Sequence, residues 1–201
     1  MAGANDKEPQ KHYDALVGAA RRDEQIVDTN NNLTRELIDG VVVRHTPTYI
    51  DKRGMVFELL DERWPEYKDA MTYAFLFTVR PKIVKGWSMH FEHEDRYCLI
   101  KGEMLLVLYD PRPDSPTFGQ VNEIYFSEHE RKVVNIPIGV WHADLGLGTE
   151  DAVVVNFPTM AYRYDTPDKI RLPIETDLIP YRFPDDCDGG GWPKKDLAES
   201  N

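Results

Sequence analysis

Cysteine is scarce in this sequence, and long apolar runs are missing. The two cysteines, Cys98 and Cys187, lie far apart and form no CxxC pair, so we interpret them as free thiols of a cytoplasmic protein. No apolar run approaches the ~20 residues that a membrane-spanning helix needs. The first residues, MAGANDKEPQKHYD, lack the apolar segment of a secretory signal. We therefore expect a cytoplasmic location and no membrane partner.

Positive charge is also in short supply. The chain has 24 Lys and Arg against 35 Asp and Glu, which gives a formal net charge of −11. Nucleic-acid binding needs a basic face, so we expect no nucleic-acid partner. A cluster of basic residues in and before the middle of the chain is compatible with one anionic ligand: Arg53, Arg80, Lys82, Lys85 and Arg96. These residues indicate either a local positive pocket or a solvated set of strand-edge charges.

The pattern of apolar residues predicts an all-β fold. The 201 residues suffice for one buried core. Short runs rich in Val, Ile, Leu, Tyr and Phe, separated by Gly, Pro, Asp and Asn, predict strands within 40–50, 71–80, 97–110, 132–138 and 151–158. Many short strands in a chain of this size predict a sandwich or barrel, because closure removes exposed sheet edges. Residues 104–109 are apolar on both faces, so we expect them deep in the structure.

Helical patterns are confined to residues 13–27 and 58–70. We predict a polar N-terminal extension over residues 1–32, a barrel over 33–183, and a mobile tail rich in Gly and Asp over 184–201. Trp192 is the exception in that tail, as an aromatic residue suited to holding it against the rest of the protein.

Chemistry-bearing side chains gather in KGWSMHFEHEDRYCLIKGE, residues 85–103. A metal site, a proton-transfer site and a solvated surface are all compatible with this run of histidines and carboxylates: His90, Glu92, His93, Glu94 and Asp95. A second segment, IPIGVWHADLG at 136–146, places Pro137, Gly139 and His142 in a P-x-G-x-x-H pattern after a tight turn. We expect His90, His142 and Asp95 to face the interior, and Glu92, His93 and Glu94 to be solvated.

The two segments resemble the paired signature motifs of the cupin superfamily, small double-stranded β-barrels (jelly rolls). In metal-binding cupins the first motif supplies His-x-His and a carboxylate, and the second supplies one more histidine. Ser88 stands here in place of the first histidine. The resemblance therefore leaves open a site for one divalent metal at His90, Asp95 and His142, with one position free for a ligand.

Further motifs extend over about residues 40–183. DKRGMVFE at 51–58 matches the pattern D-x-R-G-x-x-x-E, and RPDSPTFG at 112–119 matches a strand-connecting loop. VKGW at 84–87, IPIGVWHADL at 136–145 and YRYDTPDKIRLP at 162–173 follow in the matching order. In these segments the chain resembles the dTDP-4-dehydrorhamnose 3,5-epimerase family.

That resemblance implies a cupin-type barrel with short helical segments and an isomerase that requires no metal or organic cofactor. In the family, a histidine removes a proton next to the ketone of a 4-keto-6-deoxy sugar nucleotide, a positive group holds the enolate, and a tyrosine returns a proton from the opposite face. The nucleotide contacts, which typically reach across a homodimer, map onto Arg53 and Glu58. Lys85 stands where the family has its diphosphate-binding arginine.

The position of the family's catalytic base differs in this chain. Ser88 occupies that position, and His90 follows two residues later on the same strand face, because side chains alternate along a strand. We therefore expect His90 to act as the base, with His142 in the same cavity.

The acid and the enolate-binding positions differ as well. Asn156 occupies the position of the family's acid tyrosine, so Tyr162 and Tyr164 are candidates for a displaced acid or for stacking on the nucleobase. Near the family's enolate-binding lysine, only Arg96 keeps the charge. We therefore expect Ser88, Asn156 and Tyr164 to bind the substrate, and Arg96 and Tyr162 to take part in catalysis.

Three functions follow from these matches and departures. The first is a sugar-nucleotide epimerase or isomerase of this family, with a changed substrate or stereochemistry. The second is a metal-binding cupin enzyme that acts on another small molecule. The third is a catalytically degenerate protein that only binds a sugar nucleotide, which would account for the altered base and acid positions.

Overall fold

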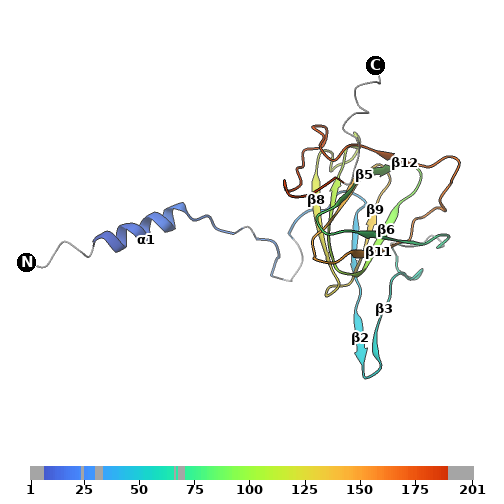
Figure 1. Ribbon diagram of the computed structural model, residues 1–201, viewed down its shortest axis with the longest axis horizontal. Helices are drawn as coiled ribbons and strands as arrows, with labels where there is room; N and C mark the ends of the chain where they lie inside the picture. Colours follow the sequence, from blue (N-terminus) through green and yellow to red (C-terminus); the bar gives the residue numbers. More distant parts are fainter. Residues whose placement is uncertain (1–6, 24, 30–33, 66, 68–70, 190–201) are drawn as a thin grey trace, which may run out of the picture. The chain divides into compact units, whose positions relative to one another are not determined.

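The computed structural model describes residues 7–23, 25–29, 34–65, 67 and 71–189. The chain divides into two units, residues 1–36 and 37–201, and the second contains the strands (Figure 1). Strands dominate, as predicted. Among the described residues no helix is long and apolar enough to cross a bilayer.

The first unit contains α1, Lys7–Ala19. The predicted helix over residues 13–27 is therefore placed too far along the chain, since the helix starts with KEPQ and ends before Arg21. Glu8 in the first turn favours the earlier start, because a carboxylate is stabilised near a helix N-terminus. The second predicted helix, over 58–70, is wrong for its described residues, which form turns and irregular structure.

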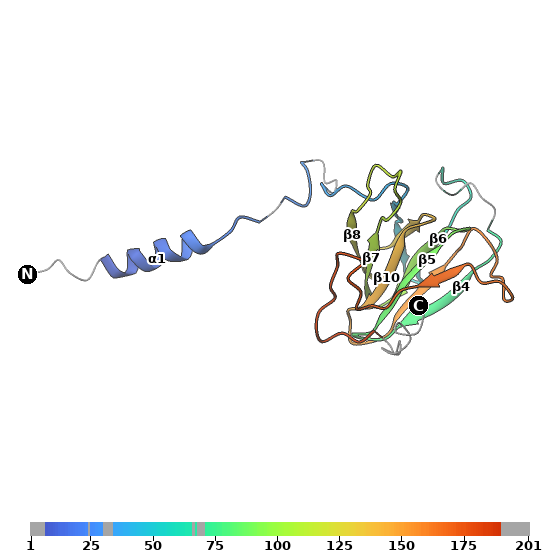
Figure 2. The same cartoon turned by 90° about the horizontal axis from the view of Figure 1, so that it is seen from above.

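Two five-stranded antiparallel sheets form the body of the second unit. The first has the order β1-β9-β6-β11-β4, with these bounds: β1 Val42–His45, β9 Lys132–Ile136, β6 Asp95–Lys101, β11 Ala152–Asn156 and β4 Phe75–Val79. The second has the order β12-β5-β10-β7-β8 (Figure 2), with these bounds: β12 Lys169–Arg171, β5 Val84–His90, β10 Trp141–Gly146, β7 Glu103–Tyr109 and β8 Val121–Ser127. This is the predicted jelly roll.

A hairpin extends away from the two sheets (Figure 1). It consists of β2, Thr48–Asp51, and β3, Gly54–Phe57, which pair with each other as a two-stranded sheet. Its apolar side chains are exposed, with Ile50 at 77% and Val56 at 63%.

Apolar side chains fill the space between the sheets and also cover both outer faces. The central cluster includes Leu99 of β6, Leu106 of β7 and Val154 of β11. A second cluster on the outer face of β5 and β10 contains Trp87 and Trp141 and packs against residues 172–187. Because β7 contributes to both clusters, its two faces are buried, as predicted from its sequence.

The boundary of the predicted C-terminal tail needs correction. Residues 184–189 are joined to the barrel, because Val84 donates its N–H to Asp188 at 2.8 Å and Asp188 donates its own to Lys82 at 2.9 Å. These backbone bonds continue the sheet edge next to β5. Residues 190–201, including Trp192, lie outside the described part of the chain.

Candidate functional site

Four neighbouring strands bring polar side chains to one end of the barrel. On β5, Ser88 and His90 share a face because they are two residues apart. Ser88 lies opposite His142 of β10 in the antiparallel register. From the other sheet, Asp95 of β6 and Asn156 of β11 face the same space.

Asp95 is the centre of this cluster. Its side chain is 4% exposed, and its Oδ2 lies 3.4 Å from His90 Nε2 and 3.6 Å from His142 Nε2. Asn156 donates its Nδ2 to Asp95 Oδ1 at 2.7 Å and accepts the backbone N–H of Arg96 at 2.9 Å. Asn156 therefore fixes the orientation of the carboxylate.

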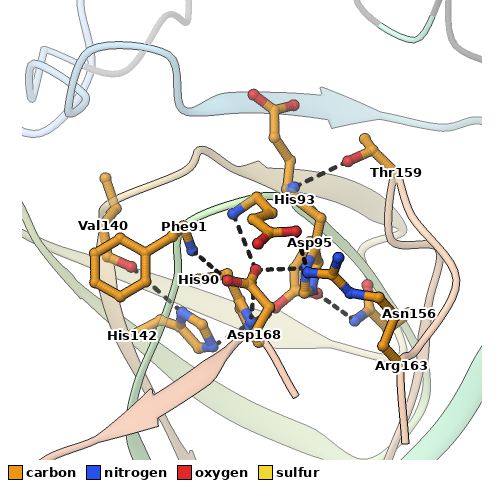
Figure 3. A network of polar contacts seen from close by, with 12 residues as sticks. His90, Phe91, His93, Asp95, Val140, His142, Asn156, Thr159, Arg163 and Asp168 are labelled. Carbon is orange, nitrogen blue, oxygen red and sulfur yellow. Dashed lines mark hydrogen bonds and ion pairs between the residues drawn. The ribbon is translucent and has the colours of Figure 1, made fainter. Parts of the chain in front are cut away.

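A second carboxylate, Asp168, approaches from the segment that precedes β12 (Figure 3). It accepts the backbone N–H groups of Phe91 at 3.1 Å and Glu92 at 2.9 Å. Its Oδ2 lies 2.9 Å from His93 Nδ1 and 3.8 Å from His90 Nδ1. The pairing of β12 with β5, Lys169 opposite His90, positions it there.

The prediction that His93 is solvated is wrong. Its side chain is 12% exposed, and its ring centroid lies 4.0 Å from that of His90. The alternation of side chains along β5 does not predict the direction of His93, because β5 ends at His90 and His93 lies in the loop that follows. Of its predicted solvated neighbours, Glu92 is exposed and pairs with Arg163, and Glu94 is half-buried.

These groups line a cavity of about 610 Å³. The cavity is lined by all three histidines and both carboxylates, and also by Lys85, Tyr97, Asp144 and Lys169. Tyr162 and Tyr164 lie at its rim, 46% and 84% exposed, with their rings in edge contact at 4.9 Å. A pocket of this size with convergent polar groups is typical of a small-molecule site.

The ionisation of the buried pair Asp95 and His142 is set by their surroundings. Burial alone raises the pKa of Asp95, but contacts with His90, His142 and Asn156 outweigh it and hold that pKa well below its usual range. Burial lowers the pKa of His142 to about 3. The cavity thus holds a carboxylate beside a neutral imidazole.

The pKa values of His93, Asp144 and Lys169 are shifted mainly by burial as well. Burial and the neighbouring His90 lower the pKa of His93. Burial raises the pKa of Asp144 to about 7. The loss of hydration around Lys169 lowers its pKa, while Asp95 and Asp144 oppose that change. Perturbed groups gathered in one cavity indicate a functional site.

The structure does not bring every predicted residue to the cavity. Arg96 is 1% exposed, and its guanidinium carbon lies 5.2 Å from the Tyr67 ring centroid, on the outer side of β6. Because Asp95 faces the cavity, its neighbour Arg96 faces the opposite way, so the assignment of Arg96 as the enolate-binding cation is wrong. Lys85 does line the cavity, where its Nζ contacts the Thr78 carbonyl at 3.2 Å.

Arg53 and Glu58 also lie away from this cavity. Arg53 is at the tip of the β2–β3 hairpin, 81% exposed and paired with Asp51. Glu58 follows the hairpin and lies 3.8 Å from Arg63. Neither belongs to the cavity lining within one chain.

The sequence reasoning missed His93 and several other polar residues of the cavity, among them Tyr97, Asp144, Asp168 and Lys169. Tyr97 and Asp144 could have been predicted from the alternation of side chains along a strand. Tyr97 lies two residues from Asp95 on β6, and Asp144 lies two residues from His142 on β10. Asp168 and Lys169 lie in the segment YRYDTPDKIRLP, residues 162–173, where the sequence pointed to Tyr162 and Tyr164 as site residues but to neither Asp168 nor Lys169.

Within the part of the chain that the structure describes, two sets of side chains have the donor types and spacing for a metal ion: His90, Asp95 and His142, and alternatively His90, His93 and Asp168. Both sets share His90.

The fold and the site together define a jelly-roll protein with an imidazole–carboxylate centre in a cavity suited to a small molecule. The chain belongs to the dTDP-4-dehydrorhamnose 3,5-epimerase family, whose model matches residues 35–178. The family predicted from the sequence motifs is confirmed.

Among curated proteins, the chain is 33% identical over 139 residues to the probable low-salt glycan biosynthesis epimerase Agl13 of Haloferax volcanii, across 69% of this chain and 89% of that protein. It is 31% identical over 149 residues to the spore coat polysaccharide biosynthesis protein SpsL of Bacillus subtilis, across 73% and 97%. Among solved structures, ChmJ, a 3′-monoepimerase from Streptomyces bikiniensis in complex with dTDP-quinovose, superimposes with a TM-score of 0.67 at 19% identity, covering 76% of this chain and 79% of that one. This last likeness establishes the fold.

Proposed function

We propose that this protein epimerises a nucleotide-linked 4-keto-6-deoxy sugar by moving a proton on a carbon next to the ketone. The observation that carries the proposal is the cluster of three histidines and two carboxylates in the cavity of a member of this epimerase family. The names of Agl13 and SpsL, which refer to glycan and polysaccharide biosynthesis, and the dTDP sugar bound to ChmJ support this substrate class.

The base in this proposal is His93. Its Nδ1 lies 2.9 Å from Asp168, close enough for the carboxylate to hold the ring in one tautomer and stabilise the imidazolium that forms. Burial lowers the pKa of His93, so its ring is neutral and able to accept a proton at pH 7. His90, the base predicted from the sequence, is the second candidate, at 3.8 Å from the same oxygen.

Lys169 takes the place of Arg96 as the cation for the enolate oxygen. It lies directly beside the histidine pair, because it pairs with His90 across β12 and β5. A preorganised charge at a developing enolate is a large catalytic contribution. Lys85, at the opposite end of β5, is suited to the diphosphate.

Tyr162 returns the proton, and Tyr164 stacks on the nucleobase at the rim. Both phenols line the cavity on the segment between β11 and β12. Ser88, 4% exposed and facing the cavity, hydrogen bonds the sugar. Asn156 acts through Asp95, whose carboxylate it holds, and not as the acid.

A homodimer completes the nucleotide site in this proposal. The β2–β3 hairpin carries Arg53 away from its own cavity and exposes Ile50 and Val56, so a second copy that receives the hairpin would bring Arg53 and Glu58 to a neighbouring cavity. Sedimentation velocity of the wild type and of Val56→Glu tests this, with a dimer that dissociates in the variant as the expected result.

The proton transfer itself requires no organic cofactor, because the ketone acidifies the neighbouring C–H bonds. The free thiols of Cys98 and Cys187 support a cytoplasmic location for the reaction.

Proton NMR of a dTDP-linked 4-keto-6-deoxy sugar in D₂O tests the reaction. We expect the wild type to remove the C3 or C5 proton signal, and His93→Gln to slow that exchange at least ~100-fold. His129→Gln, at an exposed histidine outside the cavity, is the matched control and should exchange at the wild-type rate.

Two results would contradict parts of this proposal. If His90→Gln slows the exchange and His93→Gln leaves it unchanged, then His90, and not His93, is the catalytic base. No exchange by a wild type that still binds dTDP would leave a protein that recognises the nucleotide without catalysis.

A further inference from the structure

We infer that Asp144 selects the sugar through a hydrogen bond to a hydroxyl group on the ring edge formed by C2 and C3. The inference rests on the proposed function, because it assigns a recognition role within the same cavity. Asp144 lies on β10 and lines the cavity, and its side chain is buried at 4% exposure. Neither the proposed proton transfer nor the proposed binding of the diphosphate uses it.

The Asp144 carboxyl group lacks a partner within the chain. Its Oδ1 is buried and has no hydrogen-bond partner among the residues that the structure describes. The nearby Lys85 instead donates its Nζ to the Thr78 carbonyl oxygen at 3.2 Å and lies 5.0 Å from the Phe77 ring centroid. An unpaired buried carboxyl group destabilises a fold. A ligand that fills the cavity would supply the missing partner.

Two lysines flank Asp144 in the cavity. Lys85 lies opposite it in the register of β5 and β10, and Lys169 lies opposite His90 at the other end of β5. Both lysines are close enough to interact electrostatically with the Asp144 carboxyl group. In the proposed function, Lys169 faces the oxygen at C4 and Lys85 faces the diphosphate at C1. Asp144 therefore faces the part of the sugar between these two ends.

Only one edge of the sugar offers a hydrogen-bond donor to this carboxyl group. The edge of a 4-keto-6-deoxy sugar through C2 and C3 carries hydroxyl groups, whereas the edge through C5 carries a methyl group and the ring oxygen. A hydroxyl group both donates and accepts hydrogen bonds, so it satisfies a carboxyl group in either protonation state. The two lysines repel an ammonium group at this place, which favours a neutral hydroxyl group as the partner.

A buried carboxyl group makes the site selective for a sugar that carries the hydroxyl group. A sugar without it leaves Asp144 unpaired in the complex, where water does not replace the lost hydrogen bond. We expect such a sugar to bind ~10–100-fold more weakly, the effect of one lost hydrogen bond to a charged group.

Calorimetric titration with dTDP-quinovose and with its 2-deoxy and 3-deoxy analogues tests the inference. These sugars have no ketone at C4, so they bind without reacting. We expect the wild type to bind one of the two analogues ~10–100-fold more weakly than dTDP-quinovose, and Asp144→Leu to bind all three sugars with similar affinity. The affinity for dTDP alone should be the same in both proteins, because Asp144 contacts only the sugar.

The matched control is Asp177→Leu, at a 99% exposed carboxylate outside the cavity, which should keep the wild-type preference. Asp144→Leu should melt at or above the wild-type temperature, because it removes an unpaired buried carboxyl group. Asp144→Ala carries the conclusion if Asp144→Leu does not fold.

The binding measurement does not depend on turnover. If the wild type prefers dTDP-quinovose over one deoxy analogue but exchanges no proton in D₂O, the epimerase activity is contradicted and the role of Asp144 stands. The inference is overturned if the wild type binds dTDP-quinovose and both analogues equally well or not at all. It is also overturned if Asp144→Leu and Asp144→Ala keep the wild-type preference.

Discussion

Asp110 shows at the scale of a single residue how the barrel is held together. Its buried carboxylate accepts Arg112 Nε at 2.8 Å and Thr117 Oγ1 at 2.7 Å, and Ser115 Oγ donates to it at 2.5 Å. Thr117 in turn accepts the backbone N–H of Asp39 at 2.9 Å. The SPTFG loop, residues 115–119, therefore connects the start of the barrel unit to the turn after β7 through a network of hydrogen bonds.

Asp110→Asn should lower the free energy of unfolding by about 3 kcal/mol at pH 7, because it leaves the half-buried guanidinium of Arg112 and two hydroxyl groups without their charged, fully buried acceptor. Urea denaturation monitored by tryptophan fluorescence measures this. The matched control is Asp177→Asn, in which a 99% exposed carboxylate loses its pairing with Arg182, and no measurable change is expected. If both variants lost the same free energy of unfolding, burial of the Asp110 carboxylate would not be the reason for its contribution to stability.

The same residue makes a prediction about pH. Burial raises the pKa of Asp110, but the hydrogen bonds from Arg112, Ser115 and Thr117 outweigh it and hold that pKa well below its usual range. A carboxyl with a lowered folded pKa contributes stability above its unfolded pKa of about 3.9 and loses it as the pH falls. The difference in the free energy of unfolding between the wild type and Asp110→Asn should therefore be smaller at pH 3 than at pH 6. Urea titrations at both pH values measure it. An equal difference at the two pH values would show that ionisation of Asp110 does not cause the stabilisation.

At the scale of elements, the approach of β5 to β10 shapes the floor of the cavity. Gly86 has φ +154°, and a Cβ there would lie 2.5 Å from Ala143 Cβ and 2.9 Å from the His142 carbonyl oxygen. The ladder between these strands shifts register between His142 and Asp144 at this point. Glycine thus lets β10 come close enough to place His142 and Asp144 at the cavity.

Gly86→Ala should lower the free energy of unfolding by about 2–3 kcal/mol through overpacking of β5 against β10. Thermal melting measures the loss. Gly18→Ala in α1, where an added Cβ meets nothing within 4 Å, serves as the control and should leave the melting of the barrel unchanged. A melting temperature of Gly86→Ala equal to that of the wild type would show that the two strands have room to separate.

At the scale of the whole molecule, the core belongs to the second unit. The central apolar cluster begins at Leu37 and Ile38, and the family model begins at residue 35. A chain shortened to begin at residue 35 should therefore fold, with a melting temperature within about 2 °C of the full chain. Differential scanning calorimetry checks this, and loss of the cooperative transition would show that the first 34 residues contribute to the barrel.

Much of this architecture was determined by the sequence itself. Runs such as 97–110 predict their strands because β-branched and aromatic residues favour extended structure, and Gly102, at φ +84°, separates β6 from β7. The inward positions of His90 and His142 follow from their motifs. The same alternation, applied to Asp95, would have predicted that Arg96 faces outward.

Only the tertiary structure decided how the site is completed. Asp168 lies 75 residues beyond His93 in the sequence, and the pairing of β12 with β5 brings the two together. His93 enters the cavity from a loop, where no periodicity governs the direction of a side chain. Local patterns fix which residues form strands and which face they share, but contacts between distant segments depend on how the sheets close, because many strand pairings are compatible with the same alternation of residues.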